Sequence, residues 1–212
     1  MKTWIKICGI RSLTIARTAI EHGVNALGFI LTESPRRITP EDALAIRRTF
    51  PEEVEAVGVF RNEPLEVIQE AARFIGLDRV QLHGSVDQQA ILTLSREFSV
   101  IQALSVHRDG SFDHGLLDLP AEHLLLDTTA GGQHGGTGLA FDWTILADLP
   151  RSRMIIAGGV GPENVGELVQ RYHPYGIDAN SRLEVAPGVK DPEMIVKLIN
   201  TVRRAEGFKE SK

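Results

Sequence analysis

The sequence predicts a single (β/α)₈ barrel, in which eight parallel strands alternate with helices that surround them. Short apolar runs alternate with longer segments of helical periodicity along the chain, which is the pattern of βα units. The length of 212 residues is near the roughly 200 that the smallest barrels need. Polar or glycine-rich residues follow most of the apolar runs, at the strand ends where barrels carry function. We expect the barrel to span residues 1–206 and residues 207–212 to form a frayed tail.

The eight predicted strands are nearly continuous runs of Val, Ile and Leu, which is typical of strands covered on both faces. We place them at Thr3–Cys8, Ala26–Leu31, Glu55–Phe60, Arg79–Leu82, Val100–Leu104, His123–Asp127, Met154–Ala157 and Gly176–Ala179. An open, doubly wound sheet is the alternative arrangement of such units. That fold usually carries a glycine fingerprint after its first strand, whereas Cys8-Gly9-Ile10-Arg11 stands there.

The predicted outer helices show apolar residues at a spacing near 3.6. Examples are the sets Leu13, Ala16, Ala19, Ile20 and Leu65, Ile68, Ala72, Ile75. Proline followed by acids predicts first helical turns at Pro40, Pro64, Pro162 and Pro192. Residues Asp113–Pro120 are too few for a convincing helix, so we expect a loop in the fifth unit.

Composition and charge exclude several classes of function. The formal charge of −5 is spread along the chain, and no basic stripe indicates a nucleic-acid partner. No segment approaches the roughly 20 apolar residues of a membrane span, and the N-terminus does not resemble a signal peptide. We therefore expect a cytosolic protein. Cys8 is the only cysteine, so an internal disulfide or a cysteine-based zinc site is not possible.

Glycine-rich turns after the last strands indicate a phosphate site. Gly158-Gly159 follows the seventh predicted strand and Asn180-Ser181 the eighth, where barrels often bind phosphate through backbone N–H groups. The bland alternative is that these glycines serve tight turns. The loop from Asp127 to Gly138 also holds five glycines in twelve residues, which suits a close approach to a ligand, a lid or merely a flexible connector.

Two residues at strand ends are candidates for proton transfer. Asp127 ends the apolar run Leu124-Leu125-Leu126, where desolvation would raise the pKa of its carboxyl, although helix capping is an alternative. Alternation places Trp4, Lys6 and Cys8 on one face of the first strand, which we take to be the barrel interior. There, cationic Lys6 would favour the Cys8 thiolate. Cys8 could also be a buried hydrophobe, and Lys6 could simply pair with an interior acid such as Asp178.

Other polar residues are weaker candidates. Arg36 and Arg37 follow the second strand, where a guanidinium could grip a substrate carboxylate with two hydrogen bonds, but solvated arginines are equally common. His83 could bind substrate or be structural. Lys190 and Asp191 have the character of loop and first-turn charges, and we give them no catalytic role.

Taken in order, these segments resemble phosphoribosylanthranilate isomerase over nearly the whole chain. The landmarks are Lys6-Ile7-Cys8-Gly9-Ile10, Gly28-Phe29, Ser34-Pro35-Arg36, Gly58-Val59-Phe60, Gln81-Leu82-His83-Gly84, Leu126-Asp127, Gly135-Gly136-Thr137-Gly138, Phe141-Asp142-Trp143, Gly158-Gly159-Val160 and Pro187-Gly188-Val189-Lys190-Asp191-Pro192.

The resemblance implies an Amadori rearrangement of N-(5-phosphoribosyl)anthranilate to 1-(2-carboxyphenylamino)-1-deoxyribulose 5-phosphate, with no cofactor and no metal. It implies Cys8 as general base, Asp127 as general acid and Arg36 as the ligand of the anthranilate carboxylate. We assign further substrate contacts to His83, Gly136, Gly138 and Asp178. The predicted phosphate ligands are Gly158, Gly159, Asn180 and Ser181.

The chain departs from the family pattern in the phosphate region. Asn180 and Arg182 stand where serine and glycine are expected, and Leu139 stands where lysine is common, so the set of phosphate donors is expected to be altered. Two other functions stay open. One is the sister isomerase of histidine biosynthesis, which resembles this fold but has an aspartate as base on its first strand. The other is a catalytically silent barrel that binds a phosphosugar.

Overall fold

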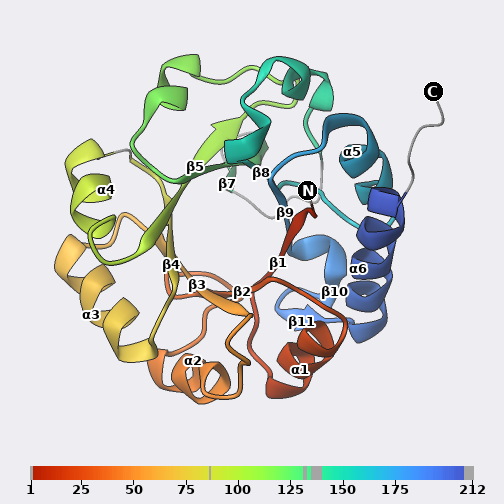
Figure 1. Cartoon of the computed structure of the whole chain (residues 1–212). Coiled ribbons are helices and arrows are strands. Elements are labelled where there is room, and N and C mark those ends of the chain that lie inside the picture. The colour runs from red at the N-terminus through yellow and green to blue at the C-terminus, as the bar shows by residue number, and fades with distance from the viewer. Residues whose placement is uncertain (1, 86, 131–132, 135–139, 208–212) are drawn as a thin grey trace.

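A computed structural model describes all residues except 1, 86, 131–132, 135–139 and 208–212. Eight parallel strands form a closed barrel, inside a ring of helices (Figure 1). Hydrogen bonds join them in the order β5-β4-β3-β2-β1-β9-β8-β6, and β5 pairs with β6 to complete the ring. The strands are β1 (Trp4–Cys8), β2 (Ala26–Ile30), β3 (Glu55–Arg61), β4 (Arg79–His83), β5 (Ser99–Val106), β6 (His123–Ala130), β8 (Met154–Ile156) and β9 (Gly176–Ala179). The prediction of an eight-stranded parallel barrel is confirmed.

Six α-helices of the described residues surround the strands, and 3₁₀ helices stand in place of α-helices after β5 and β6. The α-helices are α1 (Leu13–Glu21), α2 (Pro40–Arg47), α3 (Leu65–Ile75), α4 (Gln88–Leu94), α5 (Val165–Tyr172) and α6 (Pro192–Gly207). After β5, the 3₁₀ helix His114–Asp118 occupies the place where a loop was predicted. After β6, the 3₁₀ helix Trp143–Asp148 stands in the same position, which we did not predict. Gly207 is the last residue of α6, although we predicted it as the first of the tail.

Proline marks the start of three helices as predicted and misses the fourth. Pro40 and Pro192 open α2 and α6, and Pro64 precedes α3 directly. Helix α5 begins at Val165, later than the predicted first turn at Pro162. The reason is local: the Asn164 side chain accepts a hydrogen bond from the Gly161 N–H and donates one to the Gly159 carbonyl, which holds this segment as a turn.

Alternation along β1 separates two apolar regions. Ile5 and Ile7 are fully buried in the large core between the strands and the helices. Trp4 packs inside the barrel with small and branched residues of other strands, among them Ala26 and Ile155. The predicted interior face of β1 is therefore confirmed.

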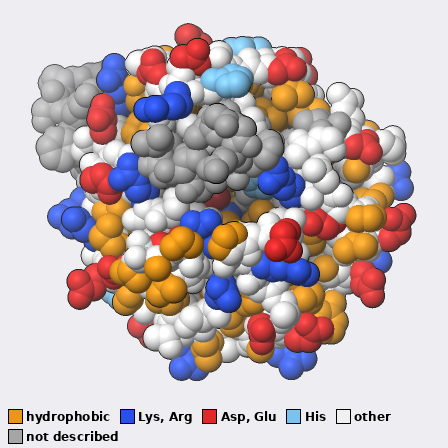
Figure 2. All heavy atoms as spheres, turned by 180° about the vertical axis from the view of Figure 1, so that it is seen from behind, with side chains coloured by type: hydrophobic (Ala, Val, Ile, Leu, Met, Phe, Trp, Pro, Cys, Tyr) orange, Lys and Arg blue, Asp and Glu red, His pale blue; other side chains and the backbone are white. Residues whose placement is uncertain are grey.

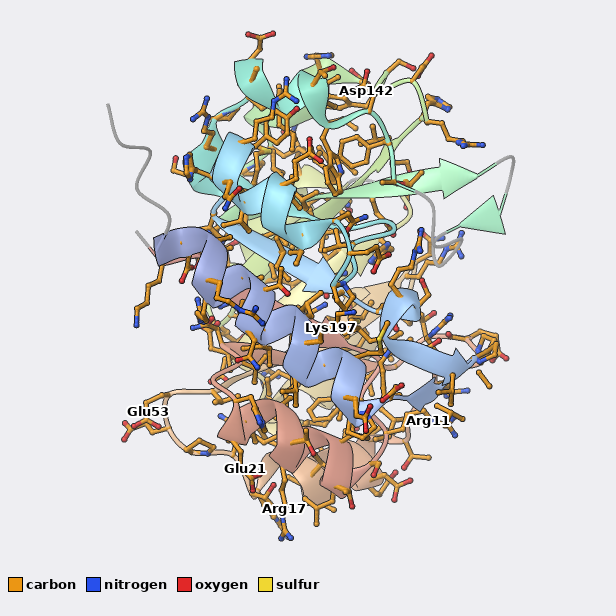
Figure 3. All side chains as sticks on the ribbon, turned by 90° about the vertical axis from the view of Figure 1, so that its right-hand side faces the viewer. Arg11, Arg17, Glu21, Glu53, Asp142 and Lys197 are labelled. Atoms are coloured by element: carbon orange, nitrogen blue, oxygen red, sulfur yellow. The ribbon has the colours of Figure 1, made fainter. Side chains whose placement is uncertain are left out.

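Two short hairpins project from the barrel at the C-terminal ends of its strands. β6 pairs antiparallel with β7 (Gln133–His134), and β10 (Glu184–Ala186) pairs antiparallel with β11 (Val189–Lys190). In Figure 3 both extend to the right, whereas the loop that carries Glu53 lies at the opposite end of the barrel. Neither hairpin was predicted.

Candidate active site

A cavity of about 470 Å³ opens at the C-terminal ends of the strands, a volume suited to a small molecule. Figure 2 looks onto this end of the barrel, where Lys and Arg side chains surround the central region. Gly136 and Gly138, which we predicted to bind substrate, lie outside the described residues. The other predicted site residues all line the cavity: Cys8, Arg36, His83, Asp127, Gly158, Gly159, Asp178, Asn180 and Ser181.

Lys6 and Asp178 form a buried ion pair beside the cavity, which Asp178 lines. Lys6 Nζ lies 2.8 Å from Asp178 Oδ2, and the two residues are register partners on β1 and β9. The alternative reading of Lys6, as the partner of an interior acid, is therefore realised. Asp178 Oδ1 is buried and has no hydrogen-bond partner in the described part of the chain. An unpaired buried carboxylate oxygen that faces a cavity is available to a ligand hydroxyl.

Cys8 lies beside this pair because β2 leaves room for it. A Cβ atom on Gly28 would stand 2.9 Å from Cys8 Sγ and 3.0 Å from Lys6 Cε. The glycine therefore admits both side chains to the barrel interior.

The pKa of the Cys8 thiol is raised above its ordinary value, mainly because burial disfavours the thiolate. The Lys6 charge acts in the opposite direction, as we predicted, and so does the Lys190 charge. The Asp178 carboxylate adds to the rise. Our expectation that Lys6 would favour the thiolate is confirmed, and burial outweighs this contribution.

Asp127 lies one residue beyond the last register pair of β6 with β8, where β6 still pairs with β5. Burial raises the pKa of its carboxyl to about 7, and the nearby charge of Asp178 acts in the same direction. A hydrogen bond with the Thr128 backbone and the charge of Lys6 oppose the rise. The predicted direction is confirmed. A carboxyl with a pKa near neutrality can give and take a proton under physiological conditions.

His83 is held neutral near physiological pH. Burial lowers its pKa to about 4, with smaller contributions from the charges of Lys6 and Arg61. His83 Nε2 lies 2.7 Å from Gln81 Nε2, so the ring has a fixed neighbour on the cavity wall. A neutral imidazole in this position can hydrogen-bond to a ligand without adding charge.

Arg36 is gripped by an acid that sequence analysis did not identify. Its Nε and Nη2 atoms lie 2.9 and 2.8 Å from Oε1 and Oε2 of Glu184. Lys190 Nζ lies 2.7 Å from Glu184 Oε1, and its side chain is only 2% exposed. Our interpretation of Lys190 as an ordinary loop charge is wrong. Arg37 points away from the cavity, with its side chain 57% exposed.

The two turns at the predicted phosphate site differ in character. Gly158 has φ +70°, and a Cβ there would stand 2.3 Å from Thr128 Oγ1, so this position requires glycine. Gly159 also has a positive φ, of +71°. Asn180 is less open to a ligand, because both its backbone and its side-chain oxygens accept hydrogen bonds from Lys190. Arg182 forms an ion pair with Glu163, at 2.9 Å, which bridges the turns after β8 and β9.

Sequence reasoning missed Glu184, Lys190 and Thr128. Glu184 and Lys190 lie only six positions apart, flanking the turn Ala186-Pro187-Gly188. An acid and a base at the two ends of a Pro-Gly turn could have indicated a hairpin with opposed charges. Thr128 offered no signal, because its close contact with Gly158 depends on the distance between two strands.

Neither a metal site nor a membrane segment is found in the described residues. No three of their His, Cys, Asp or Glu side chains are grouped so that they could hold a metal ion. No helix within the described ranges is long and apolar enough to cross a membrane.

The sequence matches the family model for N-(5'-phosphoribosyl)anthranilate isomerase over residues 5–201. It is 41% identical to the N-(5'-phosphoribosyl)anthranilate isomerase of Pelobacter propionicus, with 94% of this chain and 95% of that protein aligned. It is 39% identical to the Bacillus cereus protein of the same name, over 92% of this chain and 96% of that protein.

Solved structures agree with the sequence relatives. The phosphoribosyl anthranilate isomerase of Thermus thermophilus superposes with a TM-score of 0.86 at 35% identity, covering 95% of this chain and 99% of that one. An isomerase in complex with reduced 1-(o-carboxyphenylamino)-1-deoxyribulose 5-phosphate superposes with a TM-score of 0.83 at 33% identity, covering 97% of this chain and all of that one. Fold, cavity and sequence together show that this chain belongs to the N-(5'-phosphoribosyl)anthranilate isomerase family.

Proposed function

We propose that the chain catalyses the Amadori rearrangement of N-(5-phosphoribosyl)anthranilate in tryptophan biosynthesis, with Asp127 as general acid and Cys8 as general base. The observation that carries this proposal is that a carboxyl with a pKa of about 7 and a buried thiol line the same cavity. An aldose-to-ketose isomerisation needs one proton donor and one proton acceptor, and it needs no redox partner.

In the first step, Asp127 donates its proton to the ring oxygen of the sugar. The bond between C1 and that oxygen breaks, while the nitrogen lone pair forms a C1=N bond, so the ring opens to a protonated Schiff base. Because burial keeps a fraction of the Asp127 carboxyl protonated at neutral pH, the donor is present when substrate arrives.

In the second step, the Cys8 thiolate removes the proton from C2. The electrons form a C1=C2 bond and return the pair of the C=N bond to nitrogen, which gives an enolamine that tautomerises to the ketone. The thiolate is scarce at neutral pH because burial raises the pKa of Cys8, but Lys6 partly offsets this, and the same rise makes the thiolate a stronger base.

The remaining cavity residues bind and orient the substrate in this proposal. The free Oδ1 of Asp178 accepts a hydrogen bond from a sugar hydroxyl, and neutral His83 contributes a further contact. Backbone N–H groups of the turns at Gly158-Gly159 and Asn180-Ser181 bind the phosphate. Arg36 binds the anthranilate carboxylate. A catalytic free thiol also suits the reducing cytosol, which we propose as the location.

The test is turnover of freshly prepared N-(5-phosphoribosyl)anthranilate, followed by the loss of its fluorescence. We expect Asp127→Asn and Cys8→Ala each to lower kcat by on the order of 10²–10⁴, with binding of the reduced product analogue largely retained. Asp148→Asn removes an exposed carboxylate outside the cavity and serves as the matched control. Binding by the wild-type protein without turnover would instead identify a silent phosphosugar-binding barrel.

A further inference from the structure

Arg36 binds Glu184, and Glu184 in turn binds Lys190; neither Glu184 nor Lys190 lines the cavity. Glu184 and Lys190 face each other across the β10–β11 hairpin as register partners. Their side chains are 4% and 2% exposed, whereas that of Arg36 is 14% exposed and reaches the cavity. The three charges therefore form a line of alternating sign, with Arg36 at the ligand end.

Glu184 occupies only one of the two edges of the Arg36 guanidinium. The Nε and Nη2 atoms bind the carboxylate side-on, with Nε shared between both oxygens at 2.9 and 3.1 Å. Nη1 has no hydrogen-bond partner among the described residues, and Nη2 carries a second N–H. The Nη1–Nη2 edge can therefore bind another carboxylate end-on while Glu184 stays in place.

Lys190 changes what Arg36 presents to a ligand. A lone Arg36–Glu184 pair would have no net charge and would attract a substrate carboxylate weakly. Lys190 brings the cluster to a net charge of +1 (two cations and one anion), so that an incoming carboxylate completes its neutralisation. The Lys190 ammonium is itself saturated, with 2.7, 2.9 and 2.6 Å bonds to Glu184 Oε1 and to two Asn180 oxygens, so it cannot bind the ligand directly.

We propose that Glu184 and Lys190 are positioning residues that determine specificity for a carboxylate on the aromatic part of the substrate. Glu184 fixes the guanidinium plane of Arg36, and Lys190 supplies the surplus positive charge. This inference rests on the proposed function, because it assumes that Arg36 meets the anthranilate carboxylate. It adds that Arg36 does so through its Nη1–Nη2 edge, so that one guanidinium binds Glu184 at one edge and the substrate carboxylate at the other.

The experiment compares two ligands that differ only in the carboxylate. One is reduced 1-(o-carboxyphenylamino)-1-deoxyribulose 5-phosphate, and the other is its phenylamino counterpart. Calorimetry gives the dissociation constant of each ligand for each full-length variant, without reference to turnover. The ratio of interest is Kd of the phenylamino ligand divided by Kd of the carboxyphenylamino ligand, so a large ratio means strong preference for the carboxylate. A merely structural role would weaken both ligands alike and leave this ratio unchanged.

We expect Lys190→Met to reduce the ratio about tenfold, because it removes the surplus charge and keeps the Arg36–Glu184 fork. Lys197→Met removes an exposed lysine on the outer face of α6 (Figure 3) and should leave the ratio as in wild type. Glu184→Gln should also reduce the ratio, since the guanidinium loses its anchor. A higher ratio in Glu184→Gln would show that Glu184 competes with the ligand for Arg36, and that result overturns the proposal.

The double variant Glu184→Gln/Lys190→Met guards against misfolding of either single variant, because it removes both buried charges of the hairpin together. It keeps the wild-type net charge of +1 and lacks the anchor, so a low ratio supports positioning and a wild-type ratio contradicts it. A ratio near one in the wild-type protein would also overturn the inference. Absence of turnover together with a large wild-type ratio would contradict the proposed reaction and still support the role of Glu184 and Lys190 in carboxylate binding.

Discussion

The two ends of the barrel interior both contain charged side chains, but they treat hydrogen bonds in opposite ways. At the N-terminal end of the strands, all five N–H groups of Arg79 have partners, which are Glu55, Ser99, His123 and Tyr175. At the cavity end, buried oxygens of Gln81, Thr128 and Asp178 have none among the described residues. A satisfied network stabilises a fold, whereas unsatisfied buried oxygens that line a cavity are available to a ligand.

Aromatic rings add further contacts at the N-terminal end of the strands, which we call the closed end of the barrel. The Arg79 guanidinium lies 5.3 Å from the Trp4 ring, and the rings of His123 and Tyr175 stack at 3.8 Å. Trp4 also donates a hydrogen bond to Glu55. The closed end is therefore a plug of mutually bonded side chains, and substitutions there should affect stability and spare the chemistry.

The largest stability effect is expected for Arg79→Met. Removing this cation takes the guanidinium partner away from Glu55 and His123, so the free energy of unfolding should fall by roughly 3 kcal/mol, while kcat of the folded protein stays near wild type. Urea unfolding and turnover at the same temperature test both parts. Arg73→Met breaks the exposed Arg73–Glu97 pair and should change the free energy of unfolding far less, because solvent screens an exposed pair. Equal losses in the two variants would contradict the plug.

At the cavity end, Asp127→Asn should stabilise the fold while it abolishes most activity. The pKa of Asp127 is raised in the folded state from its ordinary value of 3.8 to about 7. The folded state therefore binds the proton more tightly, and its stability is lost as the pH rises from about 4 to about 7. Wild type should lose up to about 1.4 kcal/mol per pH unit in this window relative to the variant.

This pH dependence is measured as the difference in unfolding free energy between Asp127→Asn and wild type. His123 provides the opposite sign at the closed end, since burial and the Arg79 charge lower its pKa to about 4. Its contribution is lost as the pH falls from its ordinary pKa of 6.5 toward 4. Because His123 is present in both proteins, its contribution cancels when the unfolding free energy of wild type is subtracted from that of Asp127→Asn. A difference that stays constant with pH would show that Asp127 titrates normally.

Gly28→Ala should damage catalysis although it replaces no catalytic group. The new methyl would lie 2.9 Å from Cys8 Sγ and 3.1 Å from the Cys8 backbone, so the thiol must shift. Because small displacements of a base are costly, we expect kcat to fall on the order of tenfold. Gly166→Ala, in α5 and outside the cavity, is the control and should leave kcat unchanged. Full activity in Gly28→Ala would mean that the thiol position is not critical.

The smallest expected effect concerns Arg36→Lys, which should raise KM about tenfold, the equivalent of one charged hydrogen bond, and change kcat less. An ammonium cannot serve Glu184 and a substrate carboxylate with paired bonds. Arg37→Lys should alter KM by less than about twofold, because the Arg37 side chain is exposed. Its ion pair with Glu33, at 3.7 Å, is a weak surface contact. Steady-state kinetics decides, and a larger effect at Arg37 would reverse our assignment.

Strand positions and the interior face of β1 could be predicted from the sequence because both follow from local patterns. An apolar run of roughly four to eight residues indicates a buried strand, and the two-residue period assigns its faces. The pKa direction of Asp127 followed from the same argument, since a carboxyl after an apolar run is desolvated. The 3₁₀ helix after β6 was harder to predict, because Trp143–Asp148 has the length of a short α-helix and gives no distinct signal.

Residues that act through distant partners could not be predicted. The net pKa shift of Cys8 depends on burial and on Asp178, which is 170 positions away in the chain, as well as on Lys6. Arg36 and Glu184 meet across 148 positions. No local pattern contains such contacts, so Arg36 could be identified from the sequence as a candidate whereas its partner Glu184 could not.

The Lys6–Asp178 pair also has a consequence for folding. It joins the first strand of the barrel to the last across a separation of 172 residues, at the seam where β1 meets β9. Contacts of such high sequence separation form late, because the entropy of closing the intervening chain must be overcome first. The surroundings of the Cys8 thiol are therefore complete only after ring closure. Recovery of activity during refolding should lag behind the formation of helices and report the last step of assembly.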